Sequence, residues 1–93
     1  MKRKLLQSNA FIRSAKRIVR KDPQIADEIR RVLRLLSEDA FHPYLKTHKL
    51  KGFSGGSWAC RAGYDLRIIF DFVQHEGSDA ILLAMIGTHD QVY

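Results

Sequence analysis

Two strand-like segments near residue 60 carry side chains that could bind phosphate. From Trp58 to Phe72 the apolar residues recur mostly at every second position, which is the period of a half-buried strand. This alternation places Arg61, Asp65 and Arg67 together on the face that does not join the core. Arginine stays charged, and its planar fork binds phosphate oxygens bidentately. A sheet face with two arginines therefore favours phosphate binding.

The other residue types that support catalysis or metal binding form no recognisable motif. No cysteine and histidine spacing matches a zinc site, and no glycine-rich phosphate loop is present, so we expect neither a metal nor another cofactor. Cys60 is the only cysteine, which excludes an intramolecular disulfide and suits a reducing cytosol. Because Cys60 shares the face of Trp58, we expect it to be inert core packing. We expect His42 and His75 in a turn and a loop, without a role.

The first forty residues predict a short strand and two helices. Leu5 and Leu6 could form the strand, and Ser8 or Asn9 can cap the first helix. Apolar residues at helical spacing follow at Phe11, Ala15, Ile18 and Val19. The helix therefore has one apolar face that a core must cover.

A second helix is expected directly after the first, so that the two form an antiparallel hairpin. Asp22 is a good N-cap, and Pro23 suits the first helical position, where its missing N–H costs nothing. The apolar positions of this helix are Ile25, Ile29, Val32, Leu33 and Leu36. They predict a helix that runs to about Glu38, and the proline and glycines of residues 40–56 predict a loop after it.

The C-terminal part predicts a three-stranded meander. Ala62-Gly63 is the expected turn between the first two strands. The second strand carries its core residues at Leu66, Ile68, Phe70 and Phe72. Residues 75–78 predict a second turn. The segment from Ala80 to Ile86 is apolar on both faces, as a central strand should be, and Gly87 is expected to end it.

In chain order these elements are β-α-α-β-β-β. We expect an α+β fold, with an N-terminal strand and a helix hairpin packed on one face of a small, mainly antiparallel sheet. Residues 1–93 should form a single domain, because two cores would each have too little apolar surface to bury. Two helices can cover only one sheet face, so the face with the arginines stays partly open. We expect the tail, residues 88–93, to fold back towards these arginines.

The charge of the chain points to a polyanionic partner. Sixteen Lys and Arg stand against 10 Asp and Glu, which gives a net charge of +6. Eight of these cations lie within residues 1–21, which contain no acid. No apolar run approaches the ~20 residues of a membrane span, and no signal peptide is recognisable, so we expect a cytoplasmic protein that does not enter membranes.

Four segments together resemble the RelE/ParE superfamily of bacterial toxins from type II toxin–antitoxin pairs. They are Lys46-Thr47-His48-Lys49-Leu50-Lys51-Gly52, Trp58-Ala59-Cys60-Arg61, Tyr64-Asp65-Leu66-Arg67-Ile68-Ile69-Phe70 and Gly87-Thr88-His89-Asp90-Gln91-Val92-Tyr93. The first and last segments are most similar to the YafQ-like branch. The resemblance implies a RelE-like fold and a ribosome-dependent endoribonuclease that cuts mRNA in the decoding site without metal.

The resemblance also implies roles for individual residues. The residues at catalytic positions are His48, Asp65, His89, Arg61, Arg67 and Tyr93. In this hypothesis the two histidines and the aspartate transfer protons to and from the 2′-OH and the departing 5′-oxygen. The two arginines bind the phosphate, and the tyrosine contacts a base. Arg61 stands where the YafQ-like branch has histidine, and Leu66 where it has tryptophan.

Basic side chains on the first helix and the 40–56 loop are expected to contact RNA and the ribosome. They are Arg13, Lys16, Arg17, Arg20, Lys46, Lys49 and Lys51. Counterion release on such contacts makes affinity fall steeply with salt. The further partners implied are a cognate antitoxin with an acidic segment and, only through it, operator DNA.

Simpler interpretations of the same residues remain open at this stage. His48 could be a solvated loop residue, and His89 could cap the sheet edge. Asp65 could be a turn residue, and Arg67 could form a surface ion pair with Asp65 or Asp71. The first helix could be a plain solvated face. The alternative functions are a ParE-like DNA gyrase inhibitor and a non-catalytic RNA-binding module.

Overall fold

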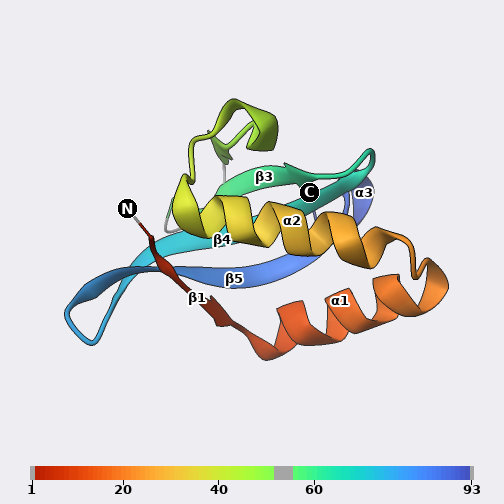
Figure 1. Ribbon diagram of the computed structural model, residues 1–93, viewed down its shortest axis with the longest axis horizontal. Helices are drawn as coiled ribbons and strands as arrows, with labels where there is room; N and C mark the ends of the chain where they lie inside the picture. Colours follow the sequence, from red (N-terminus) through yellow and green to blue (C-terminus); the bar gives the residue numbers. More distant parts are fainter. Residues whose placement is uncertain (1, 52–55, 93) are drawn as a thin grey trace.

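The structure, a computed structural model, describes residues 2–51 and 56–92 (Figure 1). In chain order its elements are β1 (Lys4–Gln7), α1 (Asn9–Lys21), α2 (Ile25–Glu38), a 3₁₀ turn η1 (Pro43–Leu45), β2 (His48–Lys49), β3 (Trp58–Ala62), β4 (Leu66–His75), β5 (Ser78–Thr88) and α3 (His89–Val92). The strands form one sheet in the order β1-β5-β4-β3-β2. Only β1 runs parallel to its neighbour, so the predicted α+β class and mainly antiparallel sheet are confirmed.

Helices α1 and α2 cover one face of the sheet and run in opposite directions, as predicted for a helix hairpin (Figure 1). The core between them and the sheet contains Phe11, Val32 and Leu36 from the helices, with Cys60 and Phe70 from the strands. All five are at most 2% exposed. Burying each large apolar side chain of this kind contributes about 1.5–3 kcal/mol, so this layer dominates the stability of the fold.

Ser8 joins α1 to the centre of the sheet. Its side chain caps the helix as predicted, because its Oγ accepts a hydrogen bond from the Phe11 N–H at 3.1 Å. The same hydroxyl donates to the Ala84 carbonyl at 2.9 Å. Ala84 lies where the register of β4 and β5 shifts, between the pairs Ile69↔Met85 and Phe70↔Leu83. The bulge thus presents a carbonyl that the helix cap can use.

The start of α2 differs from the prediction. Asp22 ends α1 instead of capping α2, because its N–H donates to the Ile18 carbonyl at 3.0 Å. Pro23 and Gln24 form the turn, and α2 begins at Ile25 without a side-chain cap. The link is so short that one residue cannot finish the first helix and start the second. The predicted end at Glu38 is confirmed.

The first part of the predicted 40–56 loop, residues 40–51, is more ordered than the sequence predicts. It contains η1 and β2, a two-residue edge strand in which His48 pairs with Ala59 and Lys49 with Trp58. Two residues are too few to show the alternation of apolar and polar side chains that is typical of a strand. Only their pairing with β3 identifies them as a strand. This adds a fifth strand to the four that were expected.

The turns also correct the predicted boundaries. Ala62 pairs with Leu66, so the turn is Gly63–Asp65 and begins one residue later than predicted. The turn at residues 75–78 is confirmed, and its central residues Glu76 and Gly77 both have positive φ, as a type I′ hairpin requires. Strand β5 continues through Gly87 to Thr88, because both residues still pair with β4.

Candidate functional site

Arg61 and Arg67 lie directly opposite each other on the sheet face that the helices leave open. They are register partners on β3 and β4. Since Cys60 and Ala62 face the helices, Arg61 between them faces the other side. Side chains opposite each other in this way begin about 5 Å apart, and two like charges there repel. A bound anion would relieve this repulsion.

Both guanidinium groups are held by backbone carbonyls. Arg61 donates through Nε to the Gly63 carbonyl, and Arg67 donates through Nη1 to the Leu66 carbonyl, each at 3.0 Å. Both side chains are half-buried. Their remaining N–H groups can bind the oxygens of a phosphate while the forks keep a defined orientation.

The arginine pair forms part of a cationic hollow of about 240 Å³. We call it the arginine hollow, and its lining residues are Lys46, His48, Arg61 and Arg67. His48 reaches it because β2 pairs with β3, which places His48 on the same face as Ala59. Its Nδ1 lies 2.9 Å from the Lys46 carbonyl, which can only accept a hydrogen bond. Nδ1 therefore carries the hydrogen, and Nε2 is the nitrogen that can take up a proton.

A larger hollow of about 680 Å³ adjoins the first. We call it the tyrosine hollow, and its lining residues are Pro43, Tyr44, Lys46, Arg61, Gly63 and Tyr64. It shares Lys46 and Arg61 with the arginine hollow. Tyr44 and Tyr64 were not among the site residues predicted from the sequence. The sequence did contain a signal for both residues. Tyr44 stands two positions before Lys46, and Tyr64 lies in the turn between the strands that carry Arg61 and Arg67.

The C-terminal segment folds back onto the open face, as expected. Val92 of α3 is buried there beside Ala59 and Ile69. Gly87 makes this return possible, because a Cβ at Gly87 would lie 2.9 Å from Gln91 Oε1 and 3.1 Å from the Val92 side chain. Val92 contacts the pair Ala59↔Ile69, which is the next pair on the same face of β3 and β4 as Arg61↔Arg67, so α3 packs beside the arginine pair.

The remaining predicted catalytic residues are not among those that line either hollow. Asp65 is exposed in the β3–β4 turn. His89 begins α3, and its Nδ1 lies 3.7 Å from Asp90 Oδ1, with 63% of the side chain exposed. Tyr93 lies outside the described residues. Within residues 2–51 and 56–92, Lys46, His48 and the arginine pair line one hollow together, whereas Asp65 and His89 do not belong to the lining of either hollow.

A family model described as the bacterial toxin of the type II toxin–antitoxin system, YafQ, matches residues 3–93. The chain belongs to the YafQ toxin family. It is therefore a toxin of the type II toxin–antitoxin class, and the resemblance seen in the sequence is confirmed. No curated protein matches the sequence significantly.

Solved structures show that the toxin has the RelE-like fold expected from the resemblance. A YoeB/ParE toxin from Agrobacterium tumefaciens has a TM-score of 0.76 and 19% identity, covering 92% of this chain and 98% of its own. A chain of the E. coli DinJ–YafQ toxin–antitoxin complex has a TM-score of 0.77 and 17% identity, covering 100% and 99%. A metal-bound toxin from Helicobacter pylori has a TM-score of 0.72 and 23% identity, covering both chains fully.

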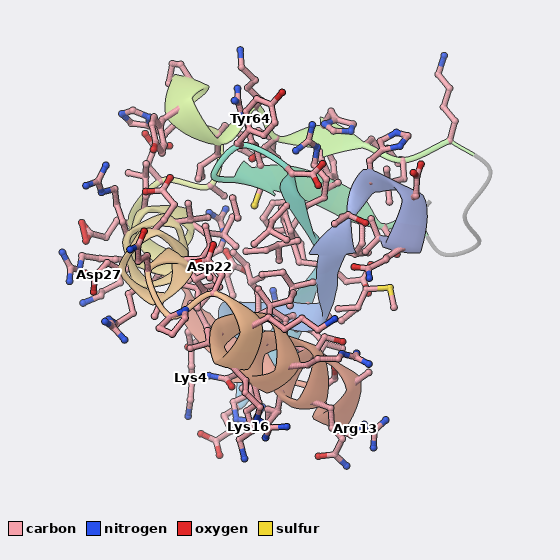
Figure 2. All side chains as sticks on the ribbon, turned by 90° about the vertical axis from the view of Figure 1, so that its right-hand side faces the viewer. Lys4, Arg13, Lys16, Asp22, Asp27 and Tyr64 are labelled. Carbon is pink, nitrogen blue, oxygen red and sulfur yellow. The ribbon has the colours of Figure 1, made fainter. Side chains whose placement is uncertain are left out.

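The basic residues of α1 form a separate surface of the toxin. We call it the basic helix face, and it consists of Arg13, Lys16, Arg17 and Arg20, all exposed. Figure 2 shows Arg13 and Lys16 at the opposite side of the molecule from Tyr64. Of the other predicted RNA-binding lysines, Lys46 lines both hollows, while Lys49 and Lys51 are exposed and line neither.

Cys60 is core packing in the toxin, as predicted. It is fully buried against the helix layer, and burial raises the pKa of its thiol from 9.0 to about 12. The thiol is thus protonated near neutral pH and is a poor nucleophile.

Among the described residues of the toxin, no group of three or more His, Cys, Asp or Glu could hold a metal ion. No helix in that part of the chain has the length and apolar character needed to cross a bilayer.

Proposed function

We propose that this toxin is an mRNA endonuclease that acts on RNA in the decoding site of the ribosome. One observation carries the proposal: Lys46, His48, Arg61 and Arg67 line a single hollow of about 240 Å³. Three cations beside an imidazole suit a reaction in which negative charge grows on a phosphate while a proton moves. Membership of the YafQ toxin family supports the same class of target.

The proposed reaction is attack of the RNA 2′-OH on its own 3′-phosphate. The new 2′-O–P bond forms as the P–O5′ bond breaks, which leaves a 2′,3′-cyclic phosphate and a 5′-OH. A base takes the 2′-OH proton and an acid supplies a proton to the 5′-oxygen. The nucleophile is already present in the RNA, so the step as written needs no metal-bound hydroxide.

Within this reaction each predicted residue has a proposed role. Arg61 and Arg67 bind the non-bridging oxygens, whose charge increases in the transition state. His48 transfers one proton through Nε2, since its Nδ1–H is held by the Lys46 carbonyl. We assign His89 and Asp65 the complementary proton transfers and Tyr93 the contact with a base. These three assignments rest on the family resemblance.

The proposed partners follow from charge and family. The basic helix face would contact ribosomal RNA, because four exposed cations on one helix suit a polyanionic surface. The solved DinJ–YafQ complex supports a cognate antitoxin for this chain. An acidic antitoxin segment is complementary to the toxin's charge, and operator DNA would be bound through the antitoxin. The proposed site of action is the cytoplasm.

The deciding experiment is cleavage of an mRNA on programmed ribosomes, with 5′ ends mapped by primer extension. We expect cleavage by the wild-type toxin, no cleavage of the same mRNA without ribosomes, and products that end in a 2′,3′-cyclic phosphate and a 5′-OH. Full activity of His89→Ala would contradict its acid–base role. Inhibition of gyrase supercoiling without mRNA cleavage would favour a ParE-like inhibitor. RNA binding without cleavage or toxicity would favour a non-catalytic module.

A further inference from the structure

The tyrosine hollow has two aromatic side chains that no step of the proposed reaction uses. Tyr64 is 91% exposed and Tyr44 is 46% exposed, whereas aromatic rings normally bury most of their surface. Figure 2 shows Tyr64 rising from the turn between β3 and β4, next to the segment that follows α2. Both rings border the same hollow, so an exposed aromatic surface lies beside the arginine hollow.

The Tyr44 side of the hollow is held in place by three features. Tyr44 lies in η1, where Pro43 restricts the backbone. Its N–H donates to Nδ1 of His42 at 3.1 Å, which caps the turn. Its hydroxyl donates to Glu28 Oε2 on α2 at 2.5 Å. Both the backbone and the far end of the ring are thus tied to fixed elements.

The Tyr64 side of the hollow is anchored to the same place on α2. Gly63 has φ +72°, a conformation that favours glycine, and a Cβ there would lie 3.2 Å from Ile25 Cδ1 and 3.5 Å from Glu28 Cγ. The turn therefore packs closely against α2. Glu28, whose side chain is only 20% exposed, contacts the Tyr44 hydroxyl and lies under the Tyr64 turn. Glu28 thus contacts both walls of the hollow, and Ile25 supports the Tyr64 wall.

The charge around the hollow selects its occupant. Its two charged lining residues are Lys46 and Arg61, both cationic. The Glu28 carboxylate beside the hollow is engaged by the Tyr44 hydroxyl and by Arg31. The volume of about 680 Å³ falls in the range of small-ligand sites. Flat aromatic surfaces beside cations suit a chain that alternates planar rings with phosphates. An acidic peptide would satisfy the charges, but it has no need of two exposed rings.

We propose that the tyrosine hollow is a stacking subsite for one unpaired nucleobase of single-stranded RNA. The base lies against Tyr44 and Tyr64 and belongs to the nucleotide next to the phosphate held by Arg61 and Arg67. Lys46 contacts the phosphate that links the two positions, because it lines both hollows. The RNA identity of the ligand rests on the proposed function. The two tyrosines would then choose which phosphate enters the arginine hollow.

The test is equilibrium binding of a fluorescent hexaribonucleotide and of the same probe with abasic riboses. We expect Tyr64→Ala to weaken binding of the complete probe about 5- to 100-fold, as loss of one stacked base does, and Tyr64→Phe to retain most of the affinity. Tyr64→Ala should leave binding of the abasic probe unchanged. Arg67→Ala is the matched control, because it should weaken both probes alike. Tyr64 is so exposed that its substitution should leave the fold, measured by circular dichroism, intact.

Glu28 provides an independent variant. We expect Glu28→Gln, which keeps an acceptor for the Tyr44 hydroxyl, to bind the complete probe as the wild type does, and Glu28→Ala to weaken it severalfold. Equal loss on complete and abasic probes in Tyr64→Ala would overturn the subsite, as would wild-type binding by that variant. Base-dependent binding without any cleavage on ribosomes would overturn the nuclease and keep the subsite. Normal cleavage at unchanged positions by Tyr64→Ala would keep the nuclease and overturn the subsite.

Discussion

The toxin carries two cationic regions that are built in opposite ways. The four cations of the basic helix face are exposed and lie on one helix. The arginine hollow draws its cations from the 40–56 segment, β3 and β4, and its two guanidinium groups are half-buried and held by carbonyls. Exposed charges attract a polyanion over a distance set by screening, whereas oriented charges recognise one phosphate. The comparison teaches that clusters of cations can serve association in one region and chemistry in the other.

The largest effect is expected from a substitution in the arginine hollow. Arg67→Ala should lower the cleavage rate on programmed ribosomes about 100- to 1,000-fold, the usual cost of removing one donor to a transition-state oxyanion. Ribosome association should change little. The matched control is Arg17→Ala on the basic helix face, which should cut at the wild-type rate once ribosomes are saturating. An equal loss of cleavage rate in both variants would show that the two cationic regions contribute to the reaction in the same way.

Charge reversal tests the other region. The variant Arg13→Glu, Lys16→Glu, Arg17→Glu and Arg20→Glu should bind ribosomes at least about tenfold more weakly at low salt. The slope of log affinity against log salt should become shallower by about one for each phosphate that the variant no longer neutralises. Sedimentation with ribosomes over a salt series measures both quantities. Association that does not depend on salt would count against a role for this face, and circular dichroism should show an unchanged fold.

A third variant tests how the tail is attached beside the arginine hollow. Val92→Ala removes apolar packing against the cluster of Leu50, Ala59 and Ile69, and it should destabilise the toxin by about 1–2 kcal/mol. Because α3 packs beside Arg67, cleavage should fall together with hydrogen-exchange protection at residues 88–92. Urea unfolding gives the stability change. A stable variant whose tail remains protected would show that other interactions hold α3 in place.

The smallest effect at neutral pH concerns Cys60, the neighbour of Arg61 on the opposite face of β3. Burial raises the pKa of its thiol from 9.0 to about 12, so above pH 9 the unfolded chain loses a proton that the folded chain keeps. Its contribution to stability is complete below pH 9 and is lost as the pH rises towards 12, by about 1 kcal/mol per unit. Urea unfolding at several pH values should show this slope in the wild type and a shallower slope in Cys60→Ala. Identical slopes would mean that the thiol is accessible to water.

Much of the fold follows from local patterns in the sequence. The stripe from Phe11 to Val19, the cap at Ser8 and the alternation along β4 each depend on residues close in the chain, so they could be predicted. The start of α2 could not, because Asp22 suits two roles and the preceding helix uses it. Strand β2 could not either, since its two residues become a strand only by pairing with β3.

For the site, the sequence by itself determined the chemistry that is available: two arginines on one sheet face, and histidines in the loop and the tail. It also determined that charge gathers on the first helix. Only the tertiary structure decided which groups meet. It brought Lys46 and His48 to the arginine pair, left Asp65 and His89 outside the lining, and placed Tyr44 and Tyr64 at one hollow. The reason is physical: alternation and capping act over a few residues, whereas a hollow forms where distant segments pack, and Glu28 and Ile25 set that packing only once α2 lies on the sheet.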